Sequence, residues 1–213
     1  MVSRPRSTES GTSTATREVL LDVGERMFAM RGIHGVSLRE IGLAAQQRNN
    51  GVTQYHFGDK AGLIKAIFQR RATTVNNRRL ELLASNERSG HSDVRSLITC
   101  YVLPLAEQVA ANTSYVAFLS RLQAEHQRDA LLDDPTADVN TAYLRIRTEL
   151  RRDHLGHLST EHFAIRWRIA LNLAIDALAD HQALKASGQR QPSTEVFSNE
   201  LIDAITALLT APV

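Results

Sequence analysis

The segment from Ser37 to Phe68 reads as two short helices joined by a polar turn, and it constrains the fold more than any other stretch. Ser37 can cap free backbone N–H groups, and Glu40 completes a capping box, so a helix of about two turns begins here. Residues 46–51 contain no apolar side chain and end in Asn-Gly. The chain must therefore turn before a second short helix.

The first short helix has an apolar face that needs a partner. Leu38, Ile41 and Ala45 recur at helical spacing along one side of it, so this side packs against another helix. Two short helices joined by a tight polar turn indicate a helix-turn-helix, whose second helix enters the major groove of DNA. Short amphipathic pairs also occur in bundles that bind no DNA, so the spacing alone leaves both interpretations open.

The residues of this segment resemble the DNA-binding domain of the tetracycline-repressor (TetR) family. The matching residues are Ile41-Gly42-x-x-Ala45 and Tyr55-His56-Phe57-Gly58-Asp59-Lys60-x-x-Leu63. The family usually has Ile-Ala-x-x-Ala-Gly-Val-Ser, followed by Gly, a hydrophobic residue, Tyr, His or Tyr, Phe, and a Lys that opens a fourth helix. Here Gln46 replaces the usual glycine, and Thr53 replaces a common hydrophobic residue. The turn is also one residue longer, with an Arg-Asn-Asn run that resembles a variant within the family.

Length and composition indicate a soluble chain of one or two domains. Its 213 residues are 43% hydrophobic, which is enough to bury a substantial core. No apolar run approaches the roughly 18 residues of a membrane span. Residues 1–15 are rich in Ser and Thr without hydrophobic periodicity, so we expect a disordered tail. This tail lacks the apolar core of a secretory signal peptide, and a cytoplasmic protein is expected.

Charge is divided unevenly along the chain. Residues 1–71 hold 11 Lys+Arg and 6 Asp+Glu, a net charge of +5, whereas residues 72–213 hold 14 and 17, a net charge of −3. A basic N-terminal third on a mildly acidic remainder is typical of a phosphate-contacting module attached to a regulatory body. A random partition of charges can give such a split too, so the asymmetry supports DNA binding without establishing it.

Hydrophobic periodicity and helix breakers predict an all-α fold of about nine helices. Three helices form a helix-turn-helix head over residues 16–70, and a larger helical body for ligand sensing and dimerisation follows over residues 71–213. Besides the two short helices, we expect helices over residues 16–31, 60–88, 92–111, 113–128, 135–154, 159–186 and 193–210. Pro104 should kink or divide the helix that contains it.

The resemblance implies which residues of the head contact DNA. Asn50, Thr53, Gln54 and Tyr55 lie on or near the recognition helix, and Gln54 or Asn50 can pair with adenine in the major groove. The longer turn leaves open which of Asn49, Asn50 and Gly51 faces the bases. Positioning contacts to phosphates are expected from Ser37, Arg39, Arg48, His56 and Lys60.

The last two long helices are the most apolar, and TetR-like proteins pair two such helices from each subunit in a four-helix dimer interface. The resemblance thus implies a homodimer that sets two heads on a roughly palindromic operator in double-stranded DNA. The candidate interface residues are Trp167, Leu171, Ile175, Leu201, Ile205 and Leu208. The alternative is that both helices simply complete the core of one chain.

The middle helices carry candidate residues for a small-molecule effector. Apolar walls with a few polar groups are typical of ligand sites, and the candidates are Tyr101, Phe118, Arg121, Leu122, Glu125, Tyr143, Trp167 and Asn172. Their chemistry favours a mostly apolar molecule, anionic or aromatic. These residues can equally be ordinary core with exposed neighbours. An effector would act by favouring one spacing of the heads, with the helix that begins at Lys60 as the transmitting element.

No pattern of residues indicates catalysis or a cofactor. The chain has no Gly-x-Ser-x-Gly turn, Gly-rich phosphate loop or zinc-protease helix motif. His154, His157 and His162 cluster around a helix break, but no further ligand completes a zinc spacing, so we expect no metal. The sequence therefore favours a non-enzymatic, dimeric transcriptional regulator. The resemblance implies a repressor that a small-molecule effector releases from DNA, since repression is the commoner role in the family. The alternative is an all-helical enzyme or binding scaffold that does not bind DNA.

Overall fold

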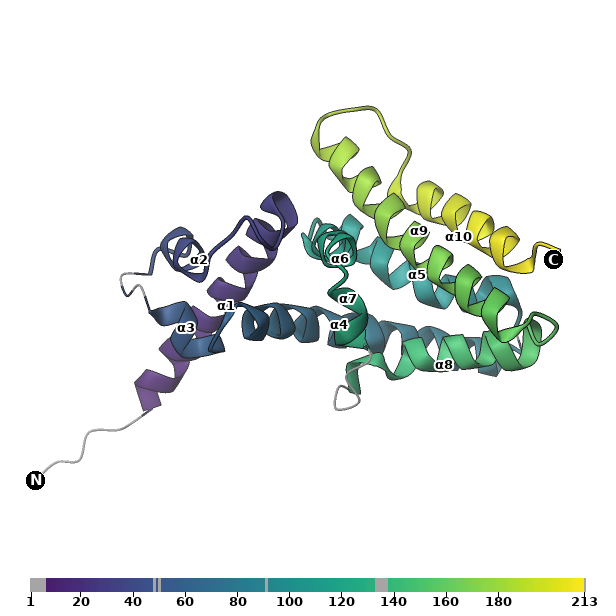
Figure 1. The fold of residues 1–213 in the computed structure, drawn as a ribbon, viewed down its shortest axis with the longest axis horizontal. Coiled ribbons are helices and arrows are strands. Elements are labelled where there is room, and N and C mark those ends of the chain that lie inside the picture. Colours follow the sequence, from purple (N-terminus) through teal and green to yellow (C-terminus); the bar gives the residue numbers. More distant parts are fainter. Residues whose placement is uncertain (1–6, 48, 50, 91, 133–137, 213) are drawn as a thin grey trace, which may run out of the picture.

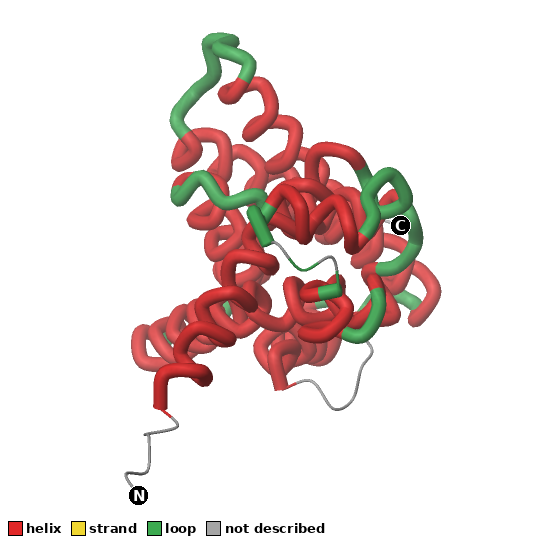
Figure 2. Tube along the Cα trace, turned by 90° about the vertical axis from the view of Figure 1, so that its left-hand side faces the viewer, coloured by secondary structure: helices red, strands yellow, loops and turns green. Residues whose placement is uncertain are grey.

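The protein is all-α. The computed structural model describes residues 7–47, 49, 51–90, 92–132 and 138–212. Figure 2 shows helices and loops with no strand in this part of the chain. A small head and a larger helical body lie at opposite ends of the molecule, and one long helix, α4, runs from the first into the second (Figure 1).

The head contains α1 (Ser7–Arg31), α2 (Leu38–Ala44), α3 (Val52–Phe57) and the first turns of α4 (Lys60–Ser89). Their buried apolar side chains, which include Leu20, Phe28, Ile41, Leu63 and Ile67, belong to a hydrophobic core that continues into the body. One expectation is wrong here. Helix α1 begins at Ser7 rather than near residue 16, so the described part of the segment expected to be disordered is helical. Residues 1–6 lie outside the described part of the chain.

Helix α4 is tied to α1 by ion pairs as well as by apolar packing. Glu25 on α1 is only 2% exposed, and its carboxylate accepts hydrogen bonds from Arg70 Nη2 at 3.1 Å and Arg71 Nε at 2.7 Å. Arg70 also pairs with Asp22 at 2.8 Å. Two arginines around one buried carboxylate satisfy its charge. The first half of α4 therefore moves with the head.

The body contains α5 (Val94–Ala110), α6 (Tyr115–Ala124), α7 (Arg128–Leu132), η1 (Asp138–Asn140), α8 (Thr141–Glu149), η2 (Leu150–His154), α9 (Thr160–Ala186) and α10 (Thr194–Thr210). Helix α5 continues through Pro104, so the expected division there does not occur. The helix expected over residues 113–128 does break, because His126 adopts a left-handed φ of 55°. Short α7 follows this break.

Helices α9 and α10 complete the core of a single chain. They pack against each other and α10 packs on α5 (Figure 1). Of the expected dimer-interface residues, Trp167, Leu171, Ile175, Leu201 and Ile205 are buried within the chain, and Leu208 is half-buried. Their own chain therefore covers most of these five side chains, and little of their area is exposed to a second copy. Their place in a dimer interface stays a prediction. The same helices instead expose Ile165, Ile169, Leu173 and Val196.

Head and body also meet where α6 packs across α1. The rings of Phe28 on α1 and Phe118 on α6 lie 6.2 Å apart. Arg121 Nε donates to the carbonyl of Ala29 at 3.2 Å, and the backbone N–H of Ile33 donates to Glu125 Oε1 at 2.9 Å. Arg121 of α6 thus binds a carbonyl in the last turn of α1, where helices leave carbonyls unpaired. Glu125, which directly follows α6, accepts from an N–H of the loop after α1. We call these contacts the α1–α6 joint.

Loss of the Glu125 carboxylate is expected to weaken this joint. Ile33 is 1% exposed, so in Glu125→Ala its N–H loses a charged acceptor in a buried place, which costs about 1–3 kcal/mol. Urea unfolding of the full chain measures this loss. Glu200→Ala, at an exposed position of α10, is the control and should lie within about 0.5 kcal/mol of the unmodified chain. Equal stability of the two variants would contradict the role given to Glu125.

Candidate nucleic-acid interface and internal cavity

Helix α2 starts at a complete capping box, as the sequence predicts. The backbone N–H of Glu40 donates to Ser37 Oγ at 3.2 Å, and that of Ser37 donates to Glu40 Oε2 at 2.8 Å. Arg31 Nη2 donates to Glu40 Oε1 at 2.7 Å. The Arg31 hydrogen bond first, and those from Ser37 next, lower the pKa of Glu40 to about 2. The carboxylate that fixes the start of α2 therefore stays ionised near neutral pH.

The turn after α2 explains one departure from the family pattern. Gln46 has a left-handed φ of 57°, while Gln47 N donates to Gly42 O at 3.0 Å and Gln46 N to Leu43 O at 2.9 Å. This is a Schellman ending, in which glycine is the usual left-handed residue. Gln46 thus adopts the conformation that favours glycine at this position of the family pattern.

Asn49 orients the start of α3 rather than reading bases with its carbonyl. The backbone N–H of Gly51 donates to Asn49 Oδ1 at 2.9 Å, a local bond typical of Asn in turns. Arg48 and Asn50, two other expected DNA contacts, lie outside the described residues.

Thr53 does not face DNA, and its assignment as a DNA contact is wrong. Its side chain is fully buried between α3 and α2. A Cβ added at Gly42 would lie 3.2 Å from Thr53 Oγ1, so the absence of a side chain at Gly42 lets the two helices approach closely. The helical period places Thr53 on the inner face of α3 and its two successors on the outer face.

The outer face of α3 presents Gln54 and Tyr55 to solvent. Tyr55 is 83% exposed, which is uncommon for an aromatic side chain. Its ring meets that of half-buried His56 edge-on, with centroids 5.2 Å apart. Ser37 and Arg39 at the start of α2 are also exposed. The head therefore displays an amide, a phenol and a guanidinium on its surface, which are groups that contact bases and phosphates.

Lys60 has a structural contact that the sequence did not suggest. Its Nζ donates to the carbonyl of Ile33 at 3.1 Å, and the side chain is partly buried. Asp59 caps α4 beside it by accepting from Gly62 N at 2.7 Å. The backbone of Ile33 is thus held by α4 through its carbonyl and by Glu125 of α6 through its N–H.

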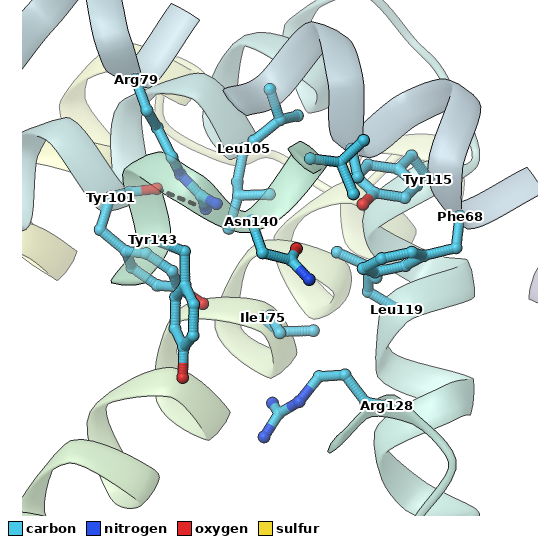
Figure 3. Close-up of a pocket in the computed structure, with 13 residues that line it drawn as sticks. Phe68, Arg79, Tyr101, Leu105, Tyr115, Leu119, Arg128, Asn140, Tyr143 and Ile175 are labelled. Carbon is cyan, nitrogen blue, oxygen red and sulfur yellow. Dashed lines mark hydrogen bonds between the residues drawn. The ribbon is translucent and has the colours of Figure 1, made fainter. Parts of the chain in front are cut away.

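The body encloses a narrow cavity between α4, α5, α6, α7, α8 and α9 (Figure 3). The cavity is small, with a free volume of about 30 Å³. The apolar part of the wall includes Phe68, Ala72, Val75, Leu105, Leu119 and Ile175. The polar part consists of Arg79, Tyr101, Tyr115, Arg128, Asn140 and Tyr143.

Two of the eight expected effector contacts, Tyr101 and Tyr143, line this cavity. The other six do not. Phe118, Arg121 and Glu125 form the α1–α6 joint, while Leu122 is fully buried core. Trp167 donates through Nε1 to Tyr143 Oη at 3.2 Å, behind the wall, and Asn172 Oδ1 accepts from Arg128 Nη1 at 3.3 Å.

Sequence reasoning missed Arg79, Arg128, Tyr115 and Asn140 as wall residues. A signal for Arg79 existed. Phe68, Ala72, Val75 and Arg79 follow at steps of four, three and four residues, so Arg79 continues the buried stripe of α4. No such signal exists for Arg128, because its position depends on the break at His126.

Other kinds of site find no support in the described part of the chain. No group of three or more His, Cys, Asp or Glu side chains there lies close enough together to hold a metal ion. Within the same residues, no helix combines the length and apolarity needed to cross a membrane.

A comparison with protein families agrees with the geometry of the head. Residues 20–67 match the family described as bacterial regulatory proteins, tetR family. The match covers the second half of α1, the whole of α2 and α3, and the first turns of α4. It confirms the family resemblance found in the sequence. A search of curated proteins finds no match.

Proposed function

We propose that this chain, whose residues 20–67 match the family, is a DNA-binding transcriptional regulator that acts as a homodimer and whose affinity for an operator is controlled by a small molecule. The observation that carries the proposal is the outer face of α3, where Gln54 and Tyr55 are exposed on a head that matches the family. Gln54 contacts the bases in this proposal, because its amide can pair with adenine in the major groove. Arg39 and Ser37 at the start of α2 contact phosphates.

Dimerisation is proposed through the exposed side of α9. Ile165, Ile169 and Leu173 recur every four residues and are 41%, 45% and 38% exposed. Such a stripe lies along one face of a helix and buries apolar area when a second copy packs on it. Two heads related by the dimer axis then meet half-sites about 34 to 36 Å apart, or a multiple of this spacing. We infer that binding of DNA represses transcription, as is common in the family.

We propose that an effector bound in the cavity controls DNA binding by displacing the helices that line it. Helix α4 lines the cavity with Phe68 and Arg79 and reaches the head at its other end. Helix α6 lines it with Tyr115 and Leu119 while its other side forms the α1–α6 joint. A ligand that moves either helix shifts the two heads, provided that it binds one arrangement better than the other.

Base reading by Gln54 is tested on an operator selected from a pool of random duplexes. Gln54→Ala should cost about 1–3 kcal/mol on the selected operator and leave binding to random DNA nearly unchanged, because only base contacts carry sequence information. Fluorescence anisotropy at fixed salt measures both affinities.

Arg39→Ala is the matched comparison for a phosphate contact. It should weaken binding to both DNAs and reduce the salt slope by about one unit. Both positions are exposed, so neither change should alter folding. Equal losses on operator and random DNA for Gln54→Ala would remove Gln54 from base reading.

The dimer is tested by sedimentation at micromolar concentration. Ile169→Asp should convert the dimer to a folded monomer, because it places a charge in an apolar contact between copies. Leu144→Asp is the control, since Leu144 on α8 is 47% exposed, close to the 45% of Ile169. A monomeric mass for the unmodified chain, or a dimer that survives Ile169→Asp, would contradict the proposed interface.

A further inference from the structure

Arg79 places a buried cation at the wall of the cavity. It is 8% exposed, and its guanidinium lies over the ring of Tyr101, 4.5 Å from the centroid. Its Nη2 donates to the carbonyl of Tyr101 at 3.1 Å, which Figure 3 marks with a dashed line. Its buried Nε has no hydrogen-bond partner among the described residues. A guanidinium has five N–H donors, so this one has donor capacity that its own chain leaves unused.

The charge of Arg79 also lacks a carboxylate partner in the described part of the chain. No Asp or Glu lines the cavity, and Arg79 forms no ion pair there. Burial lowers the pKa of Arg79, and neighbouring tyrosines only partly oppose this effect. Its neighbour Arg78 shows the contrast, because it pairs with Glu107 at 3.0 Å and Glu81 at 3.1 Å. A buried charge without an anion is costly, which marks this position as suited to an anionic partner.

The other residues that line the cavity also suit an anionic ligand with an apolar part. Arg128, 5% exposed, lines the cavity from the first position of α7. The aromatic rings of Tyr101 and Tyr143 stand beside Arg79, with centroids 6.4 Å apart (Figure 3). The cavity thus combines cationic groups with apolar and aromatic walls. Its small free volume favours a small molecule over a bulky one.

We propose that the effector is a small, mostly apolar carboxylate whose anionic group pairs with Arg79 while its apolar part lies against the tyrosine rings. The inference rests on the proposed function and adds the chemical class of the ligand and the residue that selects it. A planar carboxylate matches the fork of a guanidinium and forms charge-assisted hydrogen bonds with it. It also supplies an acceptor to the unused donors of Arg79. Tyr101 keeps the guanidinium in place through stacking and its carbonyl.

Matched acids and amides test the charge requirement. Benzoate, phenylacetate and hexanoate, each with its corresponding amide, are titrated into the full chain by calorimetry. At least one acid should bind about tenfold or more tightly than its amide, because only the acid pairs with the cation. In Arg79→Met this preference should disappear, whereas Arg78→Met should keep it. No preference in the unmodified chain, or a preference that survives Arg79→Met, would overturn the inference.

Arg79→Lys keeps the proposal testable where the methionine variant does not fold. Lysine retains the charge but not the planar fork, so the preference for the acid should be reduced and not abolished. A preference unchanged in Arg79→Lys would contradict selection by the guanidinium fork. Thermal unfolding without ligand confirms that each variant is folded.

Operator binding by the same samples separates this inference from the proposed function. If the unmodified chain binds its operator but prefers no acid, only the ligand class is wrong. If it binds no DNA, the proposed regulator itself fails, whatever the calorimetry shows. If an acid binds and operator affinity changes, the coupling is reciprocal, so the DNA complex must bind that acid with an affinity altered by the same factor.

Discussion

The arrangement of head and body depends on helix α6 being packed on two sides. One side carries Phe118, Arg121 and Glu125, which hold the end of α1. The other carries Tyr115 and Leu119, which line the cavity. Packed interiors do not deform continuously, and a displacement on one side of a rigid helix is transmitted to the other. In the proposed mechanism, the joint links the contents of the cavity to the position of α3.

The backbone of Ile33 is bound by both the body and α4. Its N–H is bound by Glu125 of the body and its carbonyl by Lys60 at the start of α4. The loop between α1 and α2 is thus held by Lys60 of α4 and by Glu125, which directly follows α6. Both α4 and α6 border the cavity. The sequence pointed to α4 as the transmitting element. The structure adds α6, which sequence reasoning had placed in the ligand site through Arg121 and Glu125.

Local signals in the sequence were sufficient to predict the start of α2 and the turn that follows it. The Ser37–Glu40 capping box depends on residues three apart, and the turn at Gln46 depends on its immediate neighbours, so both could be predicted without knowing the fold. Contacts between helices were harder to predict from the sequence. Periodicity identifies the apolar face of α9, but it does not say whether Leu171 is covered by its own chain or by a copy. The same limit applies to Arg79, whose burial depends on α5 and α8 as well as on its own helix.

The central claim is that this chain binds duplex DNA through phosphates as well as bases. The most direct measurement is the affinity for an operator-containing duplex across a range of salt concentrations. If several phosphates are neutralised, the logarithm of the binding constant should fall linearly with the logarithm of salt, with a slope of about −0.9 for each phosphate. Failure to bind DNA at low salt, or an affinity that does not depend on salt, would contradict the account.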